Sequence, residues 1–148
     1  MEITQIETPE QVEDLLVLAK DHPAVEYDCP FAYFSDYVRS MFKAGHHIRG
    51  WLAIVDGKTA GYVIAVRQKS LVNQISVFDI YVKSEYRGQH LMIHLLNKVR
   101  EWMLEDNALR VVWTSKWAQK DWAAVLQKLG LPGISLSQYS TFVFENRR

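Results

Sequence analysis

The stretch Val77–Arg100 constrains what this chain can fold into more than any other part of the sequence. It begins with the apolar, β-branched and aromatic run Val77–Val82, a composition that predicts a buried strand. Residues 83–88 then turn the chain. From Gln89 onward, apolar residues recur at helical spacing, at Leu91, Leu95, Val99 and Trp102. We therefore expect a strand, a tight turn and a helix.

The turn in this stretch is suited to an anionic ligand. A helix N-terminus carries unpaired backbone N–H groups and a partial positive charge, which favour phosphate. Arg87 adds a positive charge there, and Gly88 adds an unhindered backbone. An ordinary strand-to-helix turn with a solvated arginine has the same pattern, so both interpretations stay open.

Length and charge narrow the class of protein. A chain of 148 residues, 49% of them apolar, fits one folded domain over residues 1–148. The formal net charge is zero, with 17 basic and 17 acidic residues, so we expect no nucleic-acid and no membrane partner. Cys29 is the only cysteine and the N-terminus lacks the build of a signal peptide, so we expect a cytoplasmic protein. No apolar run approaches the ~18 residues that span a bilayer.

The N-terminal segment predicts a strand followed by a capped helix. Ile3–Glu7 can form the strand. Thr8 is then placed to cap a helix that has Pro9 at its first position and Gln11 closing a capping box. We expect this helix to end near Asp21-His22-Pro23, because the residue before a proline leaves the helical region.

A second helix and a hairpin come next. The helix is expected to run from Phe31 to about Lys43, with Gly45 as its C-terminal stop. The two hairpin strands are Trp51–Val55 and Ala60–Val66, joined by the turn signal Asp56-Gly57-Lys58.

After the central helix the pattern breaks at Asp106-Asn107, and Leu109–Thr114 is the next expected strand. A helix that crosses between this strand and Val77–Val82 would make a parallel pair in a right-handed βαβ unit. A further helix is expected over about Gln119–Leu129, and a final hairpin over Ile134–Leu136 and Tyr139–Glu145.

The run Val82-Lys83-Ser84-Glu85-Tyr86-Arg87-Gly88-Gln89, followed by an amphipathic helix, resembles the acetyl-CoA-binding segment of the GNAT family of N-acetyltransferases. The family turn has the form Arg/Gln-x-x-Gly-x-Gly/Ala. Arg87 matches its first position, whereas His90 and Met92 stand where the two glycines are expected. The order of elements also matches over nearly the whole chain. The resemblance implies an α/β fold with a central mixed sheet flanked by helices.

The same resemblance implies acetyl-CoA as co-substrate and names the residues that would bind it. The pyrophosphate would lie on the backbone at the helix start, formed by Arg87, Gly88, Gln89, His90, Leu91, Met92 and Ile93. The thioester carbonyl would meet the amides of Ile80, Tyr81 and Val82, and Gln119 would reach the pantetheine arm.

Asp79 is the candidate general base. A carboxylate in an apolar strand costs several kcal/mol unless it is paired or faces a polar cleft, and burial would make it a better base. The alternative is that Asp79 pairs with an arginine or caps a loop. Strand alternation puts Tyr81 on the same face, as a second candidate on the acceptor side. The tyrosine that serves as general acid in many family members is replaced by Leu126, so Tyr139 is the candidate substitute.

By the same resemblance, the first two helices form part of the acceptor wall, with Tyr27, Asp28, Tyr33 and Phe34 as pocket candidates. The alternative is that these residues belong to the core or to the ordinary surface and line no pocket. The sequence thus predicts transfer of acetyl from acetyl-CoA to a primary amine of a small molecule or protein. The alternative is a GNAT-fold binding or regulatory module without turnover, suggested by the residues at 90, 92 and 126.

Two other readings of the sequence are weaker. His90 and His94 lie one helical turn apart, but no third ligand is near in sequence, so we expect no metal. A protein-interaction surface could form around Trp113, Trp117 and Trp122, although such rings are more often core. We expect a monomer or a homodimer.

Overall fold

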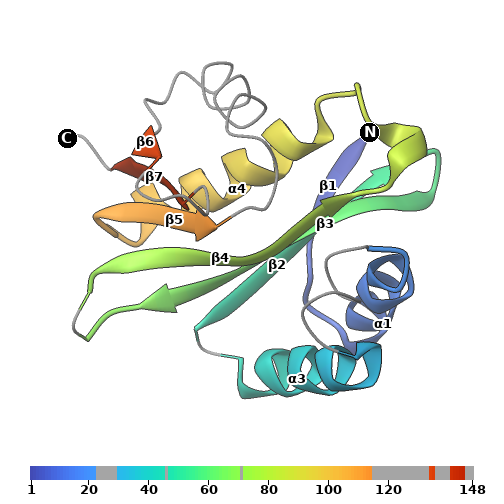
Figure 1. The fold of residues 1–148 in the computed structure, drawn as a ribbon, viewed down its shortest axis with the longest axis horizontal. Coiled ribbons are helices and arrows are strands. Elements are labelled where there is room, and N and C mark those ends of the chain that lie inside the picture. Colours follow the sequence, from blue (N-terminus) through green and yellow to red (C-terminus); the bar gives the residue numbers. More distant parts are fainter. Residues whose placement is uncertain (23–29, 46, 71, 115–133, 136–140, 146–148) are drawn as a thin grey trace.

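A computed structural model describes residues 1–22, 30–45, 47–70, 72–114, 134–135 and 141–145. Within these residues the strands form one sheet in the order β1-β2-β3-β4-β5-β7-β6 (Figure 1). All neighbouring strands are antiparallel except β4 and β5, which are parallel. The strands are β1 (Glu2–Gln5), β2 (Ile48–Val55), β3 (Lys58–Gln68), β4 (Gln74–Val82), β5 (Arg110–Thr114), β6 (Ile134–Ser135) and β7 (Thr141–Glu145). The predicted mixed sheet is confirmed.

The described helices cover both faces of the sheet. They are α1 (Pro9–Ala19), α3 (Phe31–Ala44) and α4 (Leu91–Glu105). In Figure 1, α4 lies above the sheet, and α1 and α3 lie below it. Each face has its own apolar core. One core packs under α4 around Leu95, Val99 and Trp102, and the other packs against α1 and α3 around Leu15, Val38 and Tyr62.

Local signals in the sequence set several element ends. The capping box at the start of α1 is present, with Thr8 accepting from the Gln11 amide and the Gln11 side chain bonding back. Gly45 ends α3 with a φ of 74°. In the β2–β3 turn both Asp56 and Gly57 have positive φ, which suits the twist of a hairpin. These three predictions are confirmed.

Other boundaries differ from the prediction for tertiary reasons. β2 and β4 begin earlier than their apolar runs, at Ile48 and Gln74, because pairing with β3 extends both strands. α4 begins at Leu91 and not at Gln89, because His90 has left-handed backbone dihedrals and acts as the N-cap. α1 ends at Ala19, with Lys20 as its C-cap, before the Pro23 that was expected to end it. The predicted helix over 119–129 lies outside the described residues.

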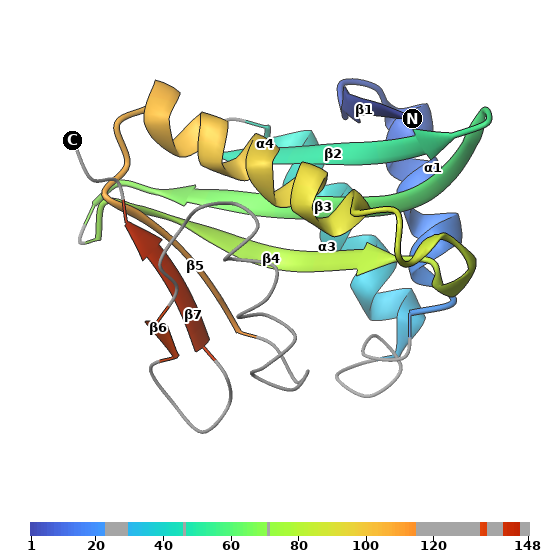
Figure 2. The same cartoon turned by 90° about the horizontal axis from the view of Figure 1, so that it is seen from above.

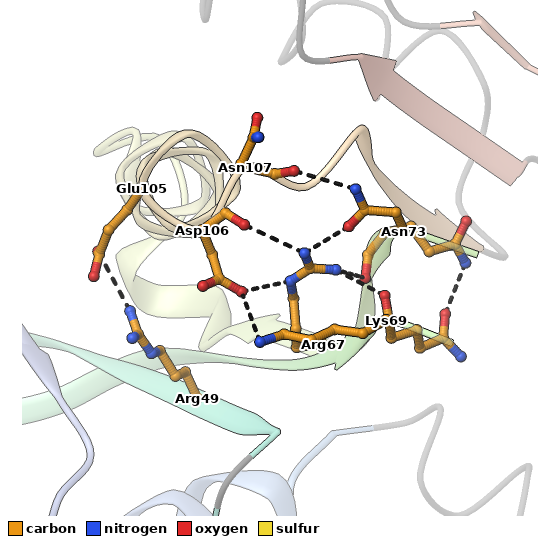
Figure 3. A network of polar contacts seen from close by, with 9 residues as sticks. Arg49, Arg67, Lys69, Asn73, Glu105, Asp106 and Asn107 are labelled. Atoms are coloured by element: carbon orange, nitrogen blue, oxygen red, sulfur yellow. Dashed lines mark hydrogen bonds and ion pairs between the residues drawn. The ribbon is translucent and has the colours of Figure 1, made fainter. Parts of the chain in front are cut away.

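A buried arginine holds one end of the sheet together (Figure 3). Nε of Arg67, in β3, lies 2.7 Å from Oδ2 of Asp106, which follows α4. Nη2 donates to Oδ1 of Asn73 (2.6 Å) before β4, and Nη1 donates to the carbonyls of Gln68 and Gln74. The hydrogen bond from Arg67 holds the pKa of Asp106 below its usual value. The network therefore joins β3, the start of β4 and the α4–β5 corner.

β4 and β5 start together at this end and then separate (Figure 2). Their parallel pairing covers only Gln74–Ser76 on β4 and Arg110–Val112 on β5. β4 continues for a further six residues, to Val82, without pairing to β5. The distal part of β4 thus presents one backbone edge that no described strand covers.

Candidate functional site

The turn after β4 contains two residues with positive φ. The chain passes from β4 through a short 3₁₀ turn (Ser84–Tyr86) to Gly88, whose φ is 92°. His90 follows with φ 61° and ψ 22°, in the left-handed region. Nε of Arg87 donates to the Val82 carbonyl at 3.2 Å, which ties the turn back to the strand end. Gln89 lies exposed between the two positive-φ residues.

His90 occupies the position where the sequence pattern expects a glycine, and its backbone adopts a glycine-like conformation. Left-handed dihedrals are uncommon outside glycine, but asparagine, aspartate and histidine are enriched there. The residue itself is exposed. His90 therefore differs from the motif in its side chain, while its backbone stays in a region of φ and ψ that glycine adopts readily.

The start of α4 presents unpaired backbone donors. The first intrahelical bond runs from the His94 amide to the His90 carbonyl (3.2 Å), so the amides of Leu91, Met92 and Ile93 have no intrahelical acceptor. The His90 side chain makes no capping hydrogen bond to them. Leu91 is buried, and Met92 packs against the core under α4. These contacts hold the helix start in place, and backbone amides in this position are the kind of group that can bind an anion.

The open edge of β4 carries the other predicted contact. The Lys83 amide donates to the Ala60 carbonyl of β3 at 2.9 Å. In an antiparallel pair the backbone groups of successive residues point alternately toward the partner strand and away from it. The backbone groups of Tyr81 therefore also point toward β3, whereas those of Ile80 and Val82 point to the edge that β5 does not pair. The Ile80 amide already donates to Oδ1 of Asp79 (3.0 Å). Of the three predicted amides, Ile80 and Val82 therefore face the open edge and Tyr81 does not.

A bulge in β4 redirects its side chains. Ile64 of β3 pairs with Asp79, and the next residue, Ala65, pairs with Val77, so Phe78 is an extra residue. Val77 packs against the core under α4, whereas the Phe78 ring lies over Phe34 of α3. Phe78 and Asp79 thus both face the α1–α3 side of the sheet.

Asp79 is held by a cluster of side chains from three elements. The Tyr62 hydroxyl of β3 donates to Oδ2 at 2.6 Å, and Nε2 of His22, just after α1, lies 3.2 Å from Oδ1. The His22 ring also stacks on Tyr81, with the ring centres 4.5 Å apart. Asp79 and Tyr81 share a face, as alternation predicts. Among the described residues, Asp79 neither pairs with an arginine nor caps a loop.

The cluster is well shielded from water. The side chain of Asp79 is 16% exposed, and His22 as a whole is 7% exposed. Burial, together with the neighbouring Asp79 carboxylate, raises the pKa of the Tyr62 phenol well above its ordinary value. Tyr62 is therefore a hydrogen-bond donor to Asp79 at neutral pH.

Sequence reasoning missed both partners of Asp79. His22 was read only as part of a helix end, and Tyr62 only as a strand residue. The signal available was weak: a histidine before a proline and a polar ring in an apolar strand. Only the packing of α1 against β3 and β4 shows that these groups converge.

A groove on the α3 side meets the bulge in β4. Its volume is about 600 Å³, and its lining residues are Tyr33, Phe34, Asp36, Tyr37, Ser40 and Phe78. The Tyr37 and Phe78 ring centres are 5.6 Å apart, and Tyr33 is 71% exposed. The structure thus brings the predicted Tyr33 and Phe34 together with Phe78, next in the chain to Asp79.

Several predicted site residues lie outside the described residues: Tyr27, Asp28, Gln119 and Tyr139. The same holds for Leu126, Trp117 and Trp122, and for the side chain of Trp113. Their predicted roles stay predictions.

The described part of the chain shows neither a cluster of metal ligands nor a membrane-spanning helix. No group of three or more His, Cys, Asp or Glu residues gathers there as a metal site would require. None of the helices that the structure describes is long and apolar enough to cross a bilayer.

Comparison with known proteins matches this architecture. The sequence model of the Acetyltransferase (GNAT) family matches residues 12–131. No curated protein matches this chain in sequence.

Several solved structures share this fold at low sequence identity. The GNAT family N-acetyltransferase YhbS from Escherichia coli, in complex with CoA, has a TM-score of 0.70 at 17% identity and covers 97% of this chain and 80% of its own. The PaiA N-acetyltransferase from Thermoplasma acidophilum, in complex with coenzyme A, has a TM-score of 0.65 at 16% identity over 100% of both chains. A GNAT-family acetyltransferase from Staphylococcus aureus has a TM-score of 0.71 at 15% identity and covers 97% and 99%. With most of its length matched by the family model and its sheet, turn and central helix arranged as above, the chain belongs to the GNAT acetyltransferase family.

Proposed function

We propose that this protein is an N-acetyltransferase that uses acetyl-CoA to acetylate a primary amine. The observation that carries the proposal is the distal edge of β4, which no described strand pairs, and which leads directly into a positive-φ turn and the first amides of α4, which have no intrahelical acceptor. An extended chain can lie along the edge of β4, and a pyrophosphate can lie on the amides at the start of α4. Relatives of the same fold are described in complex with coenzyme A, which supports the assignment.

The residues at this end fit a coenzyme A molecule. The amides of Leu91, Met92 and Ile93 would hold the pyrophosphate, and Gly88 gives the turn its path. The Val82 amide would face the thioester carbonyl. Acetyl-CoA supplies an activated acyl group, which a neutral amine can attack directly. The protein then has to orient the amine and accept a proton.

The acceptor is proposed to be a primary amine on an apolar or aromatic body. The groove of Tyr33, Phe34, Tyr37 and Phe78 offers aromatic faces to such a body, and Asp36 adds a negative charge that attracts an ammonium group. Asp36 is only partly neutralised, by a 3.5 Å contact with Arg39. Asp79, adjacent to Phe78 and held by Tyr62, would accept the proton.

Calorimetry with acetyl-CoA tests the first half of the proposal. We expect binding well below 1 mM, and no heat at ~1 mM, where the affinity is only about 4 kcal/mol, would sink it. The acetyl thioester of N-acetylcysteamine, which lacks the pyrophosphate, is the matched ligand and should bind at least about 10-fold more weakly, since it cannot use the helix amides.

Release of free thiol tests the second half. With saturating acetyl-CoA we expect 2-phenylethylamine to give a higher kcat/KM than spermidine, because the groove is apolar with one carboxylate. Asp79→Asn should lower kcat by about 100-fold or more while acetyl-CoA affinity is unchanged. A preference for spermidine would contradict the aromatic acceptor but not the reaction.

A binding module without turnover is the second candidate. It is favoured by His90 and Met92 in the phosphate turn and by Leu126 in place of the family tyrosine. It predicts acetyl-CoA binding by calorimetry without thiol release above background for any amine in a panel. Release above background refutes it.

A further inference from the structure

Among the described residues, His22 and Tyr62 contact the side chain of Asp79, the proposed base, and the proposed reaction does not yet use His22. Its ring lies between α1 and β4, with Nε2 3.2 Å from Oδ1 of Asp79 and its face stacked on Tyr81. The end of α1 fixes it from behind, because the His22 amide donates to the Ala19 carbonyl at 3.0 Å. The ring is thus held by a helix end on one side and a strand on the other.

The contact with Asp79 fixes which ring nitrogen carries hydrogen. An ionised carboxylate only accepts hydrogen bonds, so Nε2 is the donor and the lone pair of the neutral ring lies on Nδ1. Nδ1 is buried and has no hydrogen-bond partner among the described residues. The contact of Nε2 with Asp79 and the stacking on Tyr81 therefore hold the ring in one orientation.

We propose that His22 is a positioning residue for Asp79, because the bond from its Nε2 holds this carboxylate where it can accept the proton of the amine. The inference rests on the proposed acetyl transfer. In that reaction the amine nitrogen forms a bond to the acetyl carbon, the carbon–sulfur bond breaks, and its electron pair leaves with sulfur. The surplus proton of the amine passes to Asp79 and then to solvent.

Position matters for this step because a general base has to lie within hydrogen-bond reach of the proton that it takes. The Tyr62 hydroxyl binds Oδ2 of Asp79, and Nε2 of His22 lies 3.2 Å from Oδ1. The two contacts together fix the orientation of the carboxylate.

The kcat and KM values of wild type, His22→Gln and His22→Leu at one pH test the proposal, with acetyl-CoA and 2-phenylethylamine as probes. Glutamine keeps an N–H donor for Asp79, whereas leucine has none. We expect His22→Gln to keep kcat within about 3-fold of wild type, and His22→Leu to lose at least about 10-fold in kcat with the KM for acetyl-CoA unchanged. His47→Gln, which changes an exposed histidine, should keep the wild-type rate.

Two outcomes overturn the proposal. One is a His22→Leu enzyme as fast as wild type, and the other is a His22→Gln enzyme as slow as His22→Leu. A nitrogen NMR spectrum of histidine-labelled protein gives a readout that needs no turnover. We expect the Nε2–H tautomer for neutral His22 in wild type and a changed His22 resonance in Asp79→Asn, and an unchanged resonance also overturns the inference. If wild type releases no thiol with any amine, the proposed function fails while this NMR result still decides the His22–Asp79 contact.

Discussion

The Tyr62 hydroxyl, on β3, donates a 2.6 Å hydrogen bond to Oδ2 of Asp79 on the neighbouring strand. Tyr62 is fully buried, in the core between the sheet and the α1–α3 layer. The bond exists because the bulge at Phe78 turns Asp79 toward this layer. A carboxylate that would otherwise face an apolar core thus has a donor on the adjacent strand.

Removal of this donor should weaken both the fold and the reaction. For Tyr62→Phe we expect the free energy of unfolding to drop by about 1–3 kcal/mol, because a buried, charge-assisted hydrogen bond is lost. Without the bond the carboxylate is less well positioned, so kcat should fall by about 10-fold or more with acetyl-CoA affinity unchanged. Urea unfolding and thiol release measure the two effects. Unchanged values in both would show that Tyr62 does not hold Asp79.

The same tyrosine should destabilise the protein in alkali. In the folded state burial raises the pKa of Tyr62 well above its ordinary value, whereas in the unfolded chain the phenol ionises near pH 10. Above that pH the folded protein keeps a proton that the unfolded chain releases, so stability is full below about pH 10 and declines as pH rises further. Urea unfolding at pH 8, 10 and 11 should show this decline in wild type. A Tyr62→Phe protein with an equally steep decline would contradict the assignment.

The backbone at His90 predicts that a glycine is tolerated there. His90→Gly should raise the free energy of unfolding by up to about 1 kcal/mol, since glycine adopts positive φ without the Cβ penalty. Acetyl-CoA affinity should stay the same or improve. Gln89→Gly is the matched control, because Gln89 has a negative φ and glycine there only adds chain entropy. Equal stability changes in the two variants would argue against the left-handed turn.

Gly88 should be needed for both the turn and the ligand. Its φ of 92° strains any other residue, although open space surrounds the place of a Cβ. We expect Gly88→Ala to cost about 1–2 kcal/mol in stability and to weaken acetyl-CoA binding by about 10-fold or more. Gly57→Ala, in the β2–β3 hairpin with φ 75° and the same open surroundings, should cost similar stability and leave binding unchanged. Calorimetry on both variants separates these effects.

Loss of the Arg67 guanidinium should be among the most damaging single changes outside the proposed site. Arg67→Leu leaves Asn73, the Asp106 carboxylate and the Gln74 carbonyl without their donors (Figure 3). We expect a loss of about 1–3 kcal/mol, because the hydrogen bonds of the buried guanidinium are lost while the Asp106 carboxylate stays partly exposed. Arg39→Leu, which removes an exposed arginine bound to Glu13, should cost about 1 kcal/mol or less. Similar midpoints of urea unfolding for the two variants would contradict the structural role of Arg67.

Features set by a few neighbouring residues were predictable from sequence. The capping box at Thr8 and Gln11, the turn at Asp56-Gly57 and the helical spacing from Leu91 to Trp102 each depend on local backbone geometry. The motif around Arg87 and Gly88 also located the turn that precedes α4, whereas its role in holding an anion stays a prediction. Element ends were less predictable, because strand pairing extends β2 and β4 beyond their apolar runs.

The sequence by itself thus determined the order of elements, the family turn and the candidate carboxylate at position 79. Tertiary structure decided what surrounds that carboxylate, since His22 and Tyr62 lie 57 and 17 residues away from it. It also decided the bulge at Phe78 and the parting of β4 from β5, which come from the register of strand pairing. The physical reason is that local pattern fixes dihedral preference, whereas contacts between distant residues depend on how the helices and strands pack.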